Sequence, residues 1–442
     1  MSRRNLKSFS FLIFPFLLAA SFFGCGDQGS STSGTTPPPP PPPGSWRGTQ
    51  QFGTPFNDVG QGIARDSSAN IYITGSTGGN LDGNTSSGQL DVFLTKFDST
   101  GNKLFTRQIG TAFEDIGYAV AVDGSGNVFV TGSTGGSLPG NTSFGQLDVF
   151  LAKFDPSGTL LFARQFGTPF NDIGRGIALD GSGNIFITGW TEGSLGSTSS
   201  GQQDVFLAKI DPFGNLTIRQ FGTPFNDIGY GVALDSGGNV FVTGSTGGSL
   251  PPNISFGQLD VFLARFDPSG NLAIQQLGTA FNDIGYGLAV DSSGNVFITG
   301  STDGVFGANA FGLLDVFLVK FNATGVLVFT QQFGTPFSDI GYAVAVDSTG
   351  NVNITGSTDG SLGSNISAGQ LDVFLAKFDP SGASLFASQF GTPFNDTGFG
   401  IAVDSGDNVF ITGSTVGNLD GNISAGLSDI FLAKFNSAGV KQ

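Results

Sequence analysis

Residues 428–442, SDIFLAKFNSAGVKQ, end the chain at a turn. The same phrase occurs earlier as LDVFLAKFDPSGTLLFARQFGT, residues 147–168, where it continues into a further apolar segment. That missing segment has a counterpart near the other end of the chain, because SWRGTQQFG, residues 45–53, aligns with VLVFTQQFG, residues 326–334. We therefore expect residues 45–53 to supply the outer strand of the last repeat, closing a ring and removing an open sheet edge.

Internal repetition fills the chain after residue 44. The motif Q-(F/I/L)-G-T-(P/A)-F begins at residues 51, 108, 165, 220, 276, 332 and 389. In the second copy, strand-like runs cover residues 117–123, 128–134, 148–155 and 160–167, separated by turns rich in Gly, Asn and Asp. No segment has a helical period. The pattern predicts an all-β fold for residues 45–442, a seven-bladed β-propeller with four antiparallel strands per blade, closed by the N-terminal strand.

The first two predicted strands of each repeat, together with the turn between them, carry a recognisable phrase. It stands as GYGLAVDSSGNVFITGST at residues 285–302 and as GYAVAVDSTGNVNITGST at residues 341–358. These stretches resemble the bacterial seven-bladed β-propeller repeat family, often called SBBP. The resemblance implies an extracytoplasmic propeller and no single activity. Local departures from the repeat are Arg65, Ala69, Trp190, Asn353 and Asp407.

The first 44 residues have the composition of a targeting segment and a linker. A basic start, MSRRNLK, precedes the apolar run FSFLIFPFLLAASFF, and residues 1–24 resemble a bacterial lipoprotein signal peptide that is cleaved before Cys25. Phe22 stands where that signal usually has Leu, and an ordinary secretory signal is the alternative. Residues 25–44 combine the Cys anchor with a tether rich in Gly, Ser, Thr and Pro. We expect an extracytoplasmic protein, lipid-anchored at Cys25 to the bacterial envelope, at the outer membrane or cell surface rather than the inner membrane.

Composition narrows the choice of partners. Among the 442 residues there is no His and one Cys, and the formal net charge is −16. The chain is therefore not expected to bind nucleic acid or to form an intrachain disulfide. Of the 34 acidic residues, 26 recur at four positions of the repeat, where Asp is suited to accept hydrogen bonds from turn N–H groups.

Two sets of equivalent positions in the repeat, one acidic and one basic, are candidates for cation binding and for ion pairing. Seven Asp residues precede the first strands and are candidates for a ring that holds a cation such as Ca²⁺, with turn capping or ion pairing as alternatives: Asp58, Asp115, Asp172, Asp227, Asp283, Asp339 and Asp396. A basic column inside the third strands is predicted to form ion pairs with one of the Asp columns: Lys96, Lys153, Lys209, Arg265, Lys320, Lys377 and Lys434. No cofactor is expected.

Variable positions suggest a binding face. Position two of the first strand differs among blades, and its side chains either line a channel mouth or pack between blades: Gln61, Tyr118, Arg175, Tyr230, Tyr286, Tyr342 and Phe399. The loop between second and third strands also varies, and it is predicted to share a face with the GTPFNDIG loop. Its aromatic residues are expected either to be exposed there or to cover the tops of the blades: Trp190, Phe144, Phe256 and Phe311. The remaining Phe residues are expected to pack between blades.

The usual parts of a catalytic site are missing from the sequence. It has no His, no free Cys apart from the predicted anchor, no phosphate-binding loop and no nucleophile elbow. We expect a monomeric binding module for a protein or glycan partner. The alternatives are a glycosidase or lyase that uses loop carboxylates such as Glu192, and a structural scaffold of the envelope without a small ligand.

Overall fold

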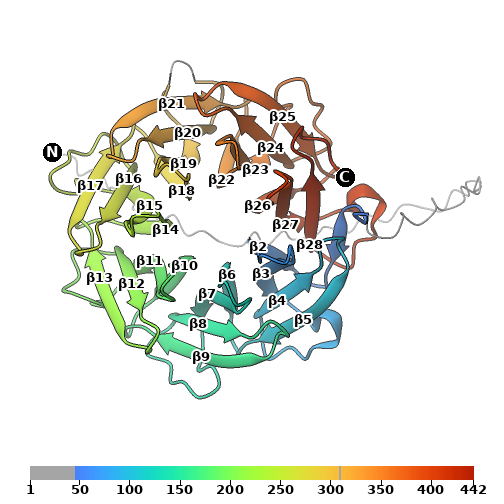
Figure 1. Ribbon diagram of the computed structural model, residues 1–442, viewed down its shortest axis with the longest axis horizontal. Coiled ribbons are helices and arrows are strands. Elements are labelled where there is room, and N and C mark those ends of the chain that lie inside the picture. The colour runs from blue at the N-terminus through green and yellow to red at the C-terminus, as the bar shows by residue number, and fades with distance from the viewer. Residues whose placement is uncertain (1–44, 308–309) are drawn as a thin grey trace, which may run out of the picture. The chain divides into compact units, whose positions relative to one another are not determined.

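Each repeat forms one four-stranded antiparallel sheet, and seven such sheets form the blades of a β-propeller. The computed structural model describes residues 45–307 and 310–442, which form one compact unit. Figure 1 shows the blades around a central axis, with the first strand of each blade innermost. The predicted fold class is confirmed.

The strands follow the repeat closely. The first strands are β2 (Asp58–Arg65), β6 (Asp115–Val122), β10 (Asp172–Leu179), β14 (Asp227–Leu234), β18 (Asp283–Val290), β22 (Asp339–Val346) and β26 (Asp396–Val403). The second strands are β3 (Ile71–Thr77), β7 (Val128–Thr134), β11 (Ile185–Thr191), β15 (Val240–Thr246), β19 (Val296–Thr302), β23 (Val352–Thr358) and β27 (Val409–Thr415).

The outer half of each blade is equally regular. The third strands are β4 (Asp91–Phe97), β8 (Asp148–Phe154), β12 (Asp204–Ile210), β16 (Asp260–Phe266), β20 (Asp315–Phe321), β24 (Asp372–Phe378) and β28 (Asp429–Phe435). The fourth strands are β5 (Lys103–Ile109), β9 (Leu160–Phe166), β13 (Leu216–Phe221), β17 (Leu272–Leu277), β21 (Leu327–Phe333), β25 (Ser384–Phe390) and β1 (Gln50–Phe52). Two 3-10 turns, η1 (Leu81–Gly83) and η2 (Leu419–Gly421), lie in loops.

The short hairpins depend on the Asp residue at the end of a strand. In the hairpin between β10 and β11, the Asp180 carboxylate accepts hydrogen bonds from the backbone N–H groups of Ser182 (2.9 Å) and Asn184 (2.8 Å). Gly183 has a φ of 83°, a conformation that glycine adopts without strain. The predicted capping role of these acids is therefore observed.

The ring closes as predicted, through β1. This strand pairs antiparallel with β28, with Gln51 opposite Phe431. The Gln51 amide donates to the Asp429 carboxylate (2.7 Å) and to the Gly417 carbonyl (2.8 Å). Within a single repeat, Gln165 makes the same bond to Asp148 at 2.7 Å. A residue from the start of the described chain thus takes the place of a fourth-strand glutamine in the seventh blade.

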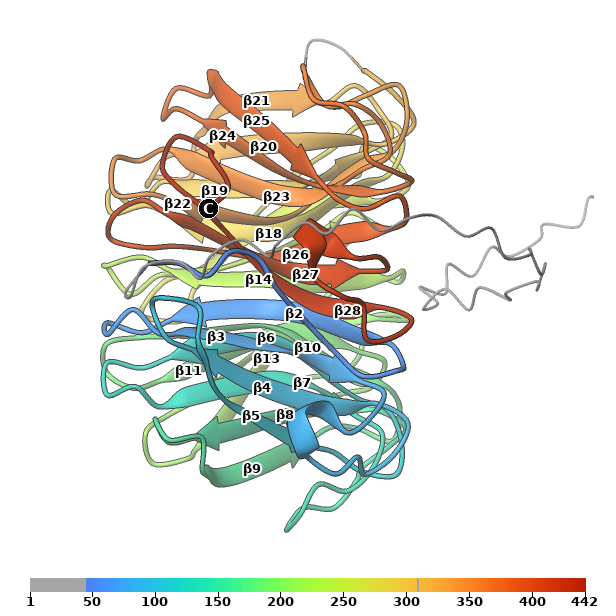
Figure 2. The same cartoon turned by 90° about the vertical axis from the view of Figure 1, so that its right-hand side faces the viewer.

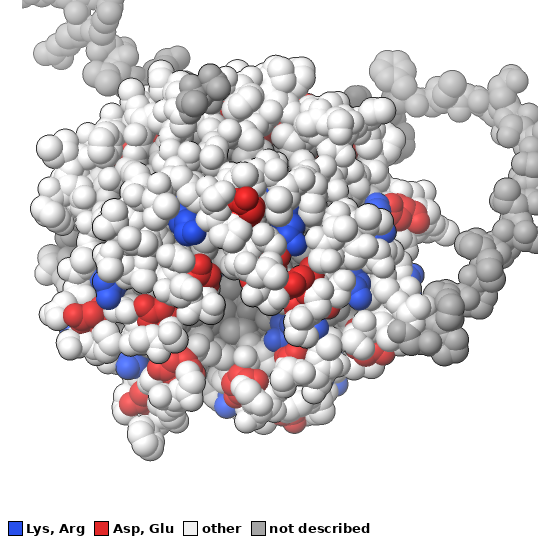
Figure 3. All heavy atoms as spheres, turned by 45° about the horizontal axis from the view of Figure 1, so that its top comes forward, with Lys and Arg blue, Asp and Glu red and all other residues white. Residues whose placement is uncertain are grey.

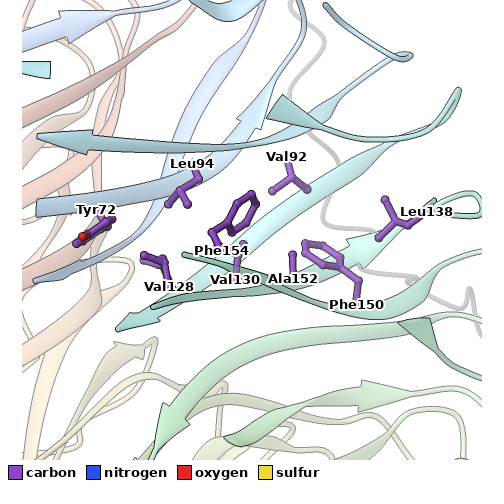
Figure 4. Packing of buried hydrophobic residues seen from close by; sticks show 10 residues of the cluster. Tyr72, Val92, Leu94, Val128, Val130, Leu138, Phe150, Ala152 and Phe154 are labelled. Atoms are coloured by element: carbon purple, nitrogen blue, oxygen red, sulfur yellow. The ribbon is translucent and has the colours of Figure 1, made fainter. Parts of the chain in front are cut away.

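The core lies between adjacent blades rather than at one centre. Second strands are buried along almost their whole length. Figure 4 shows one interface, where Tyr72 and Leu94 of the first blade meet Val128, Phe150 and Phe154 of the second. Burying an aromatic side chain of this size contributes about 1.5–3 kcal/mol.

The basic column does not behave as predicted. Lys153 lies over the Phe129 ring at 4.9 Å, and Lys209 lies over the Phe186 ring at 5.6 Å. The reason is register, because every cation of the column except Lys377 stands directly opposite an aromatic residue of the second strand, as Lys153 stands opposite Phe129. Among the described residues, only Lys377 of this column forms an ion pair, with Asp347 at 2.8 Å.

The predicted signal segment, Cys25 and the tether lie outside the described residues. Among residues 45–307 and 310–442, no helix has the length and apolar character needed to cross a bilayer.

Candidate binding face

Two kinds of loop meet on one face of the propeller. The long loop between β7 and β8 ends beside the connection between β9 and β10, where Asp172 N–H donates to the Leu147 carbonyl at 2.8 Å. A parallel bridge joins Leu147 to Asn171, and equivalent bridges occur in every blade. The predicted pairing of these loops on one face is therefore observed, and we call this side the long-loop face. Figure 2 shows the ring from its side, with loops projecting at both faces.

Seven phenylalanines of the G-T-(P/A)-F motif form the most regular feature of the long-loop face. Their exposed fractions lie between 51% and 57%: Phe56, Phe113, Phe170, Phe225, Phe281, Phe337 and Phe394. The prediction that these Phe residues pack between blades is therefore wrong for the seven. The Phe113 side chain lies against the backbone of Gly135 and Gly136, where a Cβ atom would approach it within 3.0 Å. The two glycines thus leave room for the Phe113 side chain, which stays about half exposed.

The long loops add further apolar residues. Ile254, Ile366 and Ile423, at equivalent loop tips, are 77%, 88% and 85% exposed. Phe144, Phe256 and Phe311 are exposed as predicted, at 53%, 57% and 46%. Exposed apolar side chains that gather on one side of a soluble domain mark interaction surfaces.

Trp190 does not belong to this face, and its predicted exposure is wrong. It lies within β11, is 9% exposed, and pairs with Ile173 and Val205 of the neighbouring strands. Trp190 is the last residue but one of this strand, which ends at Thr191. The equivalent position in the other blades is a serine, such as Ser245 or Ser301.

The variable residues of the first strands occupy a β-bulge. In β10, Gly174 pairs with Gly189 and Gly176 pairs with Thr188, which leaves Arg175 as an extra, unpaired residue. The same irregularity recurs in all seven first strands. A bulge turns a side chain away from the normal alternation of a strand. The seven bulge residues are Gln61, Tyr118, Arg175, Tyr230, Tyr286, Tyr342 and Phe399.

Bulge residues of neighbouring blades contact one another around the axis. Ring centroids are 5.0 Å apart for Tyr230 and Tyr286, 5.4 Å for Tyr286 and Tyr342, and 5.1 Å for Tyr342 and Phe399. On the other side of the ring, the Arg175 guanidinium lies 4.0 Å from the centroid of Tyr118. Burial raises the pKa of Tyr342 to about 12, so its hydroxyl stays protonated at neutral pH.

A cavity of about 220 Å³ follows the axis. Tyr286 and Tyr342 contribute to its wall, together with aliphatic side chains of the first strands such as Ile63, Val120 and Ile177. The first strands of all seven blades thus line a narrow axial channel.

The seven Asp residues of the candidate cation ring are buried and accept hydrogen bonds from turn residues. Asp172 is fully buried, and its carboxylate accepts hydrogen bonds from the Thr168 N–H (2.5 Å) and hydroxyl (2.9 Å). Burial raises the pKa of this carboxyl, and the neighbouring Asp148 adds to the effect. Its six equivalents, Asp58, Asp115, Asp227, Asp283, Asp339 and Asp396, are also fully buried. In the described part of the chain, no three His, Cys, Asp or Glu residues come together as metal ligands.

The acids of the loops are scattered over separate blades. The Glu192 carboxylate accepts from the Asn171 amide at 2.9 Å, and Asp303 accepts from the Asn282 amide at 3.0 Å. Asp82 pairs with Lys103 at 2.7 Å. Each of these carboxylates thus fastens a loop to its own blade.

The opposite face has another chemical character. It carries the short hairpins, whose turns contain 12 of the 26 acids that recur in the repeat. Figure 3 shows Asp, Glu, Lys and Arg side chains interspersed around the central hollow.

Comparison with known proteins gives a family and distant relatives. The SBBP family, described as a β-propeller repeat, matches seven times, at residues 48–82, 104–139, 161–196, 218–251, 274–307, 328–363 and 385–420. The regulatory protein FlaEY of Caulobacter vibrioides is 25% identical over 418 residues, covering 80% of this chain and 43% of that protein. A WD repeat-containing protein of Acanthamoeba polyphaga mimivirus is 24% identical, covering 74% and 26%. The chain spans less than half the length of these relatives.

Several solved structures are similar to this chain at low sequence identity. The WD40 domain of Neurospora crassa Pan2 is 12% identical with a TM-score of 0.49, covering 87% of this chain and 95% of that one. The WD40 propeller domain of Doa1 is 11% identical with a TM-score of 0.49, covering 86% and 95%. Puromycin hydrolase is 11% identical with a TM-score of 0.49, covering 88% and 54%.

Proposed function

The chain belongs to the SBBP family of β-propeller repeats, and we propose that it is a binding module that holds a protein partner on its long-loop face. The observation that carries the proposal is the sevenfold ring of phenylalanines, each about half exposed. A rigid scaffold that presents exposed aromatic residues offers large contact area at a small cost in conformational entropy.

The chemistry of the face favours a protein over a glycan. Sugars stack on flat aromatic rings, whereas Ile254, Ile366 and Ile423 offer branched aliphatic tips that suit an apolar protein surface. The partner is therefore expected to present an apolar patch without many charges.

The bulge residues can fix the rotation of a partner about the axis, which the phenylalanines cannot. Seven equivalent rings cannot distinguish one rotation of a partner from another, because they repeat in every blade. Arg175, Gln61 and Phe399 differ from the tyrosines at the same position, so contacts at the channel would fix the orientation of a partner.

A pair of crosslinking positions tests the proposal. A photoreactive amino acid replaces Phe170 on the long-loop face or, as control, Leu161, which is 52% exposed on the outer strand β9. We expect a discrete crosslinked protein in cells for position 170 only. A triple variant, Phe170→Ser, Phe225→Ser and Phe281→Ser, should lose that partner while keeping its melting temperature. Equal crosslinking at both positions, or a triple variant that still binds, contradicts the proposal.

In the proposed arrangement the module is anchored outside the cytoplasm through acyl chains on Cys25, as the apolar segment before this residue suggests. Mass spectrometry of the mature N-terminus checks this. An unmodified thiol, or a membrane-bound Cys25→Ala variant, rules the anchor out.

The module is also proposed to act without catalysis. Glu192 and Asp303 are engaged in separate loops, far apart in the repeat order, and pair with amides instead of with each other. Turnover of a polysaccharide that disappears in Glu192→Gln would contradict this part.

A further inference from the structure

A cavity of about 420 Å³ lies between the sixth and seventh blades, at the face of the short hairpins. Asp347, Asn351 and Lys377 of the sixth blade line it, together with Asp407 and Ser437 of the seventh. This site is on the opposite side of the ring from the long-loop face and does not depend on the proposed function.

Next to Asn351 and opposite Lys377, two residues that line the cavity, β23 carries a departure from the repeat. Asn353 stands where the other six blades have a buried aromatic residue: Tyr72, Phe129, Phe186, Phe241, Phe297 and Phe410. Those aromatic residues fill the space beside the next blade, as Phe297 does in the cluster with Val352 and Phe378. The smaller asparagine leaves the interface of blades six and seven without that ring.

Lys377 changes its partner as a consequence. Its equivalents lie over aromatic rings, as Lys320 lies 5.2 Å from the centroid of Phe297. Lys377 instead pairs with Asp347 at 2.8 Å and donates to the Ser437 carbonyl at 3.1 Å. The two charged side chains are only 5% and 1% exposed. An ammonium group has three donors, so one N–H of Lys377 remains for another acceptor.

The Asn353 amide itself has no partner. The residue is fully buried, and among the described residues neither its oxygen nor its nitrogen makes a hydrogen bond. Buried polar groups are nearly always satisfied, because leaving them unpaired is unfavourable. Asn353 stands directly opposite Lys377 in the paired strands.

A second departure comes from the seventh blade. Asp407 occupies a turn position that is glycine in five other blades, and it has a φ of 60°. Its carboxylate reaches the sixth blade, where it accepts hydrogen bonds from the Ser348 N–H (2.9 Å) and hydroxyl (3.0 Å). Two residues that depart from the repeat are thus brought to the two sides of one blade interface.

From this convergence we propose that the cavity binds a carbohydrate residue. A neutral sugar hydroxyl both donates and accepts, so it can serve the free N–H of Lys377 and the carboxylate of Asp407, which both line the cavity. Leu385 and Phe386 provide an apolar wall for the C–H face of a sugar ring. Two carboxylates against one ammonium disfavour an anion, and Lys377 already occupies the place of a cation.

Reversion to the repeat residue provides the test. Full-length protein is titrated with glucose, galactose, mannose and N-acetylglucosamine by saturation-transfer NMR and applied to a glycan array. We expect the wild-type chain to bind at least one sugar, and Asn353→Phe to weaken that binding at least tenfold. Because six other blades carry an aromatic residue here, Asn353→Phe should melt no earlier than the wild type. Asp407→Gly, which restores the glycine of the repeat, should weaken binding as well.

Several results would overturn the proposal. One is a wild-type chain that binds no sugar in either assay, which would leave only ordered water in the cavity. Another is a folded Asn353→Phe variant that binds the same sugar as tightly as the wild type. A third is sugar binding that disappears in the triple Phe→Ser variant of the long-loop face but not in Asn353→Phe, because the sugar site would then lie on the opposite face.

Discussion

At the scale of single residues, an aspartate in this chain has a pKa set by its place in the repeat. Asp172 lies in the blade interior, where burial raises the pKa of its carboxyl. Asp98 lies in an exposed turn, where hydrogen bonds from Asn102 and Thr100 outweigh desolvation and lower its pKa to about 2. The two classes act in opposite directions on stability. The contribution of Asp172 is lost as pH rises through its folded pKa, and that of Asp98 is lost as pH falls below its unfolded pKa.

Asp347 permits a sharper prediction, because its carboxyl is buried against Lys377. Although desolvation acts against it, hydrogen bonds from Lys377 and Asn351 hold its pKa at about 2, below the unfolded value of 3.8. The folded chain therefore binds fewer protons than the unfolded chain between these values, and the contribution of Asp347 disappears as pH falls through them. Asp347→Asn should lower the free energy of unfolding by roughly 2 kcal/mol at pH 7 and by much less at pH 2. Thermal unfolding of both proteins at the two pH values measures this, and an equal difference at both would contradict it.

Side-chain positions were the least predictable part. Phe170 follows a turn sequence, and nothing in that sequence tells whether the ring faces solvent or the next blade. The absence of strand alternation around it was the one available signal. Trp190 was assigned to the long loop although the repeat places it inside the second strand, which ends at Thr191. The basic column was misassigned because an aromatic cross-strand partner competes with a carboxylate, and register decides between them.

At the scale of elements, the first strand of each blade depends on glycines of the second. In β15, a Cβ atom on Gly244 would lie 1.8 Å from the Ile228 carbonyl oxygen, just before the bulge residue Tyr230. The same crowding recurs at the equivalent glycine of every blade, for example Gly189 and Gly300. The bulge and the glycine opposite it are thus one structural device.

Replacing that glycine should be far more harmful than replacing a turn glycine. Gly244→Ala is expected to destabilise the chain by several kcal/mol, about the size of a severe core mutation, or to prevent folding. Gly124→Ala is the matched control, because nothing lies within 4 Å of a Cβ atom there. Circular dichroism melts of the two variants compare them. Similar melting temperatures would show that the bulge does not need the glycine.

Strand limits were predictable, whereas the bulge was not. Apolar runs and Gly-Asn turns placed the second strand of the second repeat at residues 128–134, as observed. An extra residue that occurs in all seven repeats leaves no irregular spacing to detect. The sequence therefore marked Arg175 and Tyr286 as variable, but it could not show that they contact their neighbours around the axis.

At the scale of the whole propeller, closure of the ring determines the architecture. A missing strand at one end and a spare strand at the other were enough to predict it, because no other arrangement pairs both edges. The junction is extensive. The Asn422 amide donates to the Thr49 carbonyl at 3.0 Å, Trp46 lies 5.7 Å from Phe410, and Phe52 packs against Phe93 and Phe97 of the first blade.

Deletion of residues 45–53 tests closure most directly, with thermal unfolding and light scattering as the readouts. The deletion exposes the edge of β28, removes the bonds of Gln51 and loses the partial burial of Phe52, which contributes a fraction of the roughly 1.5–3 kcal/mol of a fully buried Phe. We expect a protein that melts well below the parent and aggregates, and that is rescued by a synthetic peptide of residues 45–57. A truncated protein that stays monomeric and melts with the parent would contradict the closed ring.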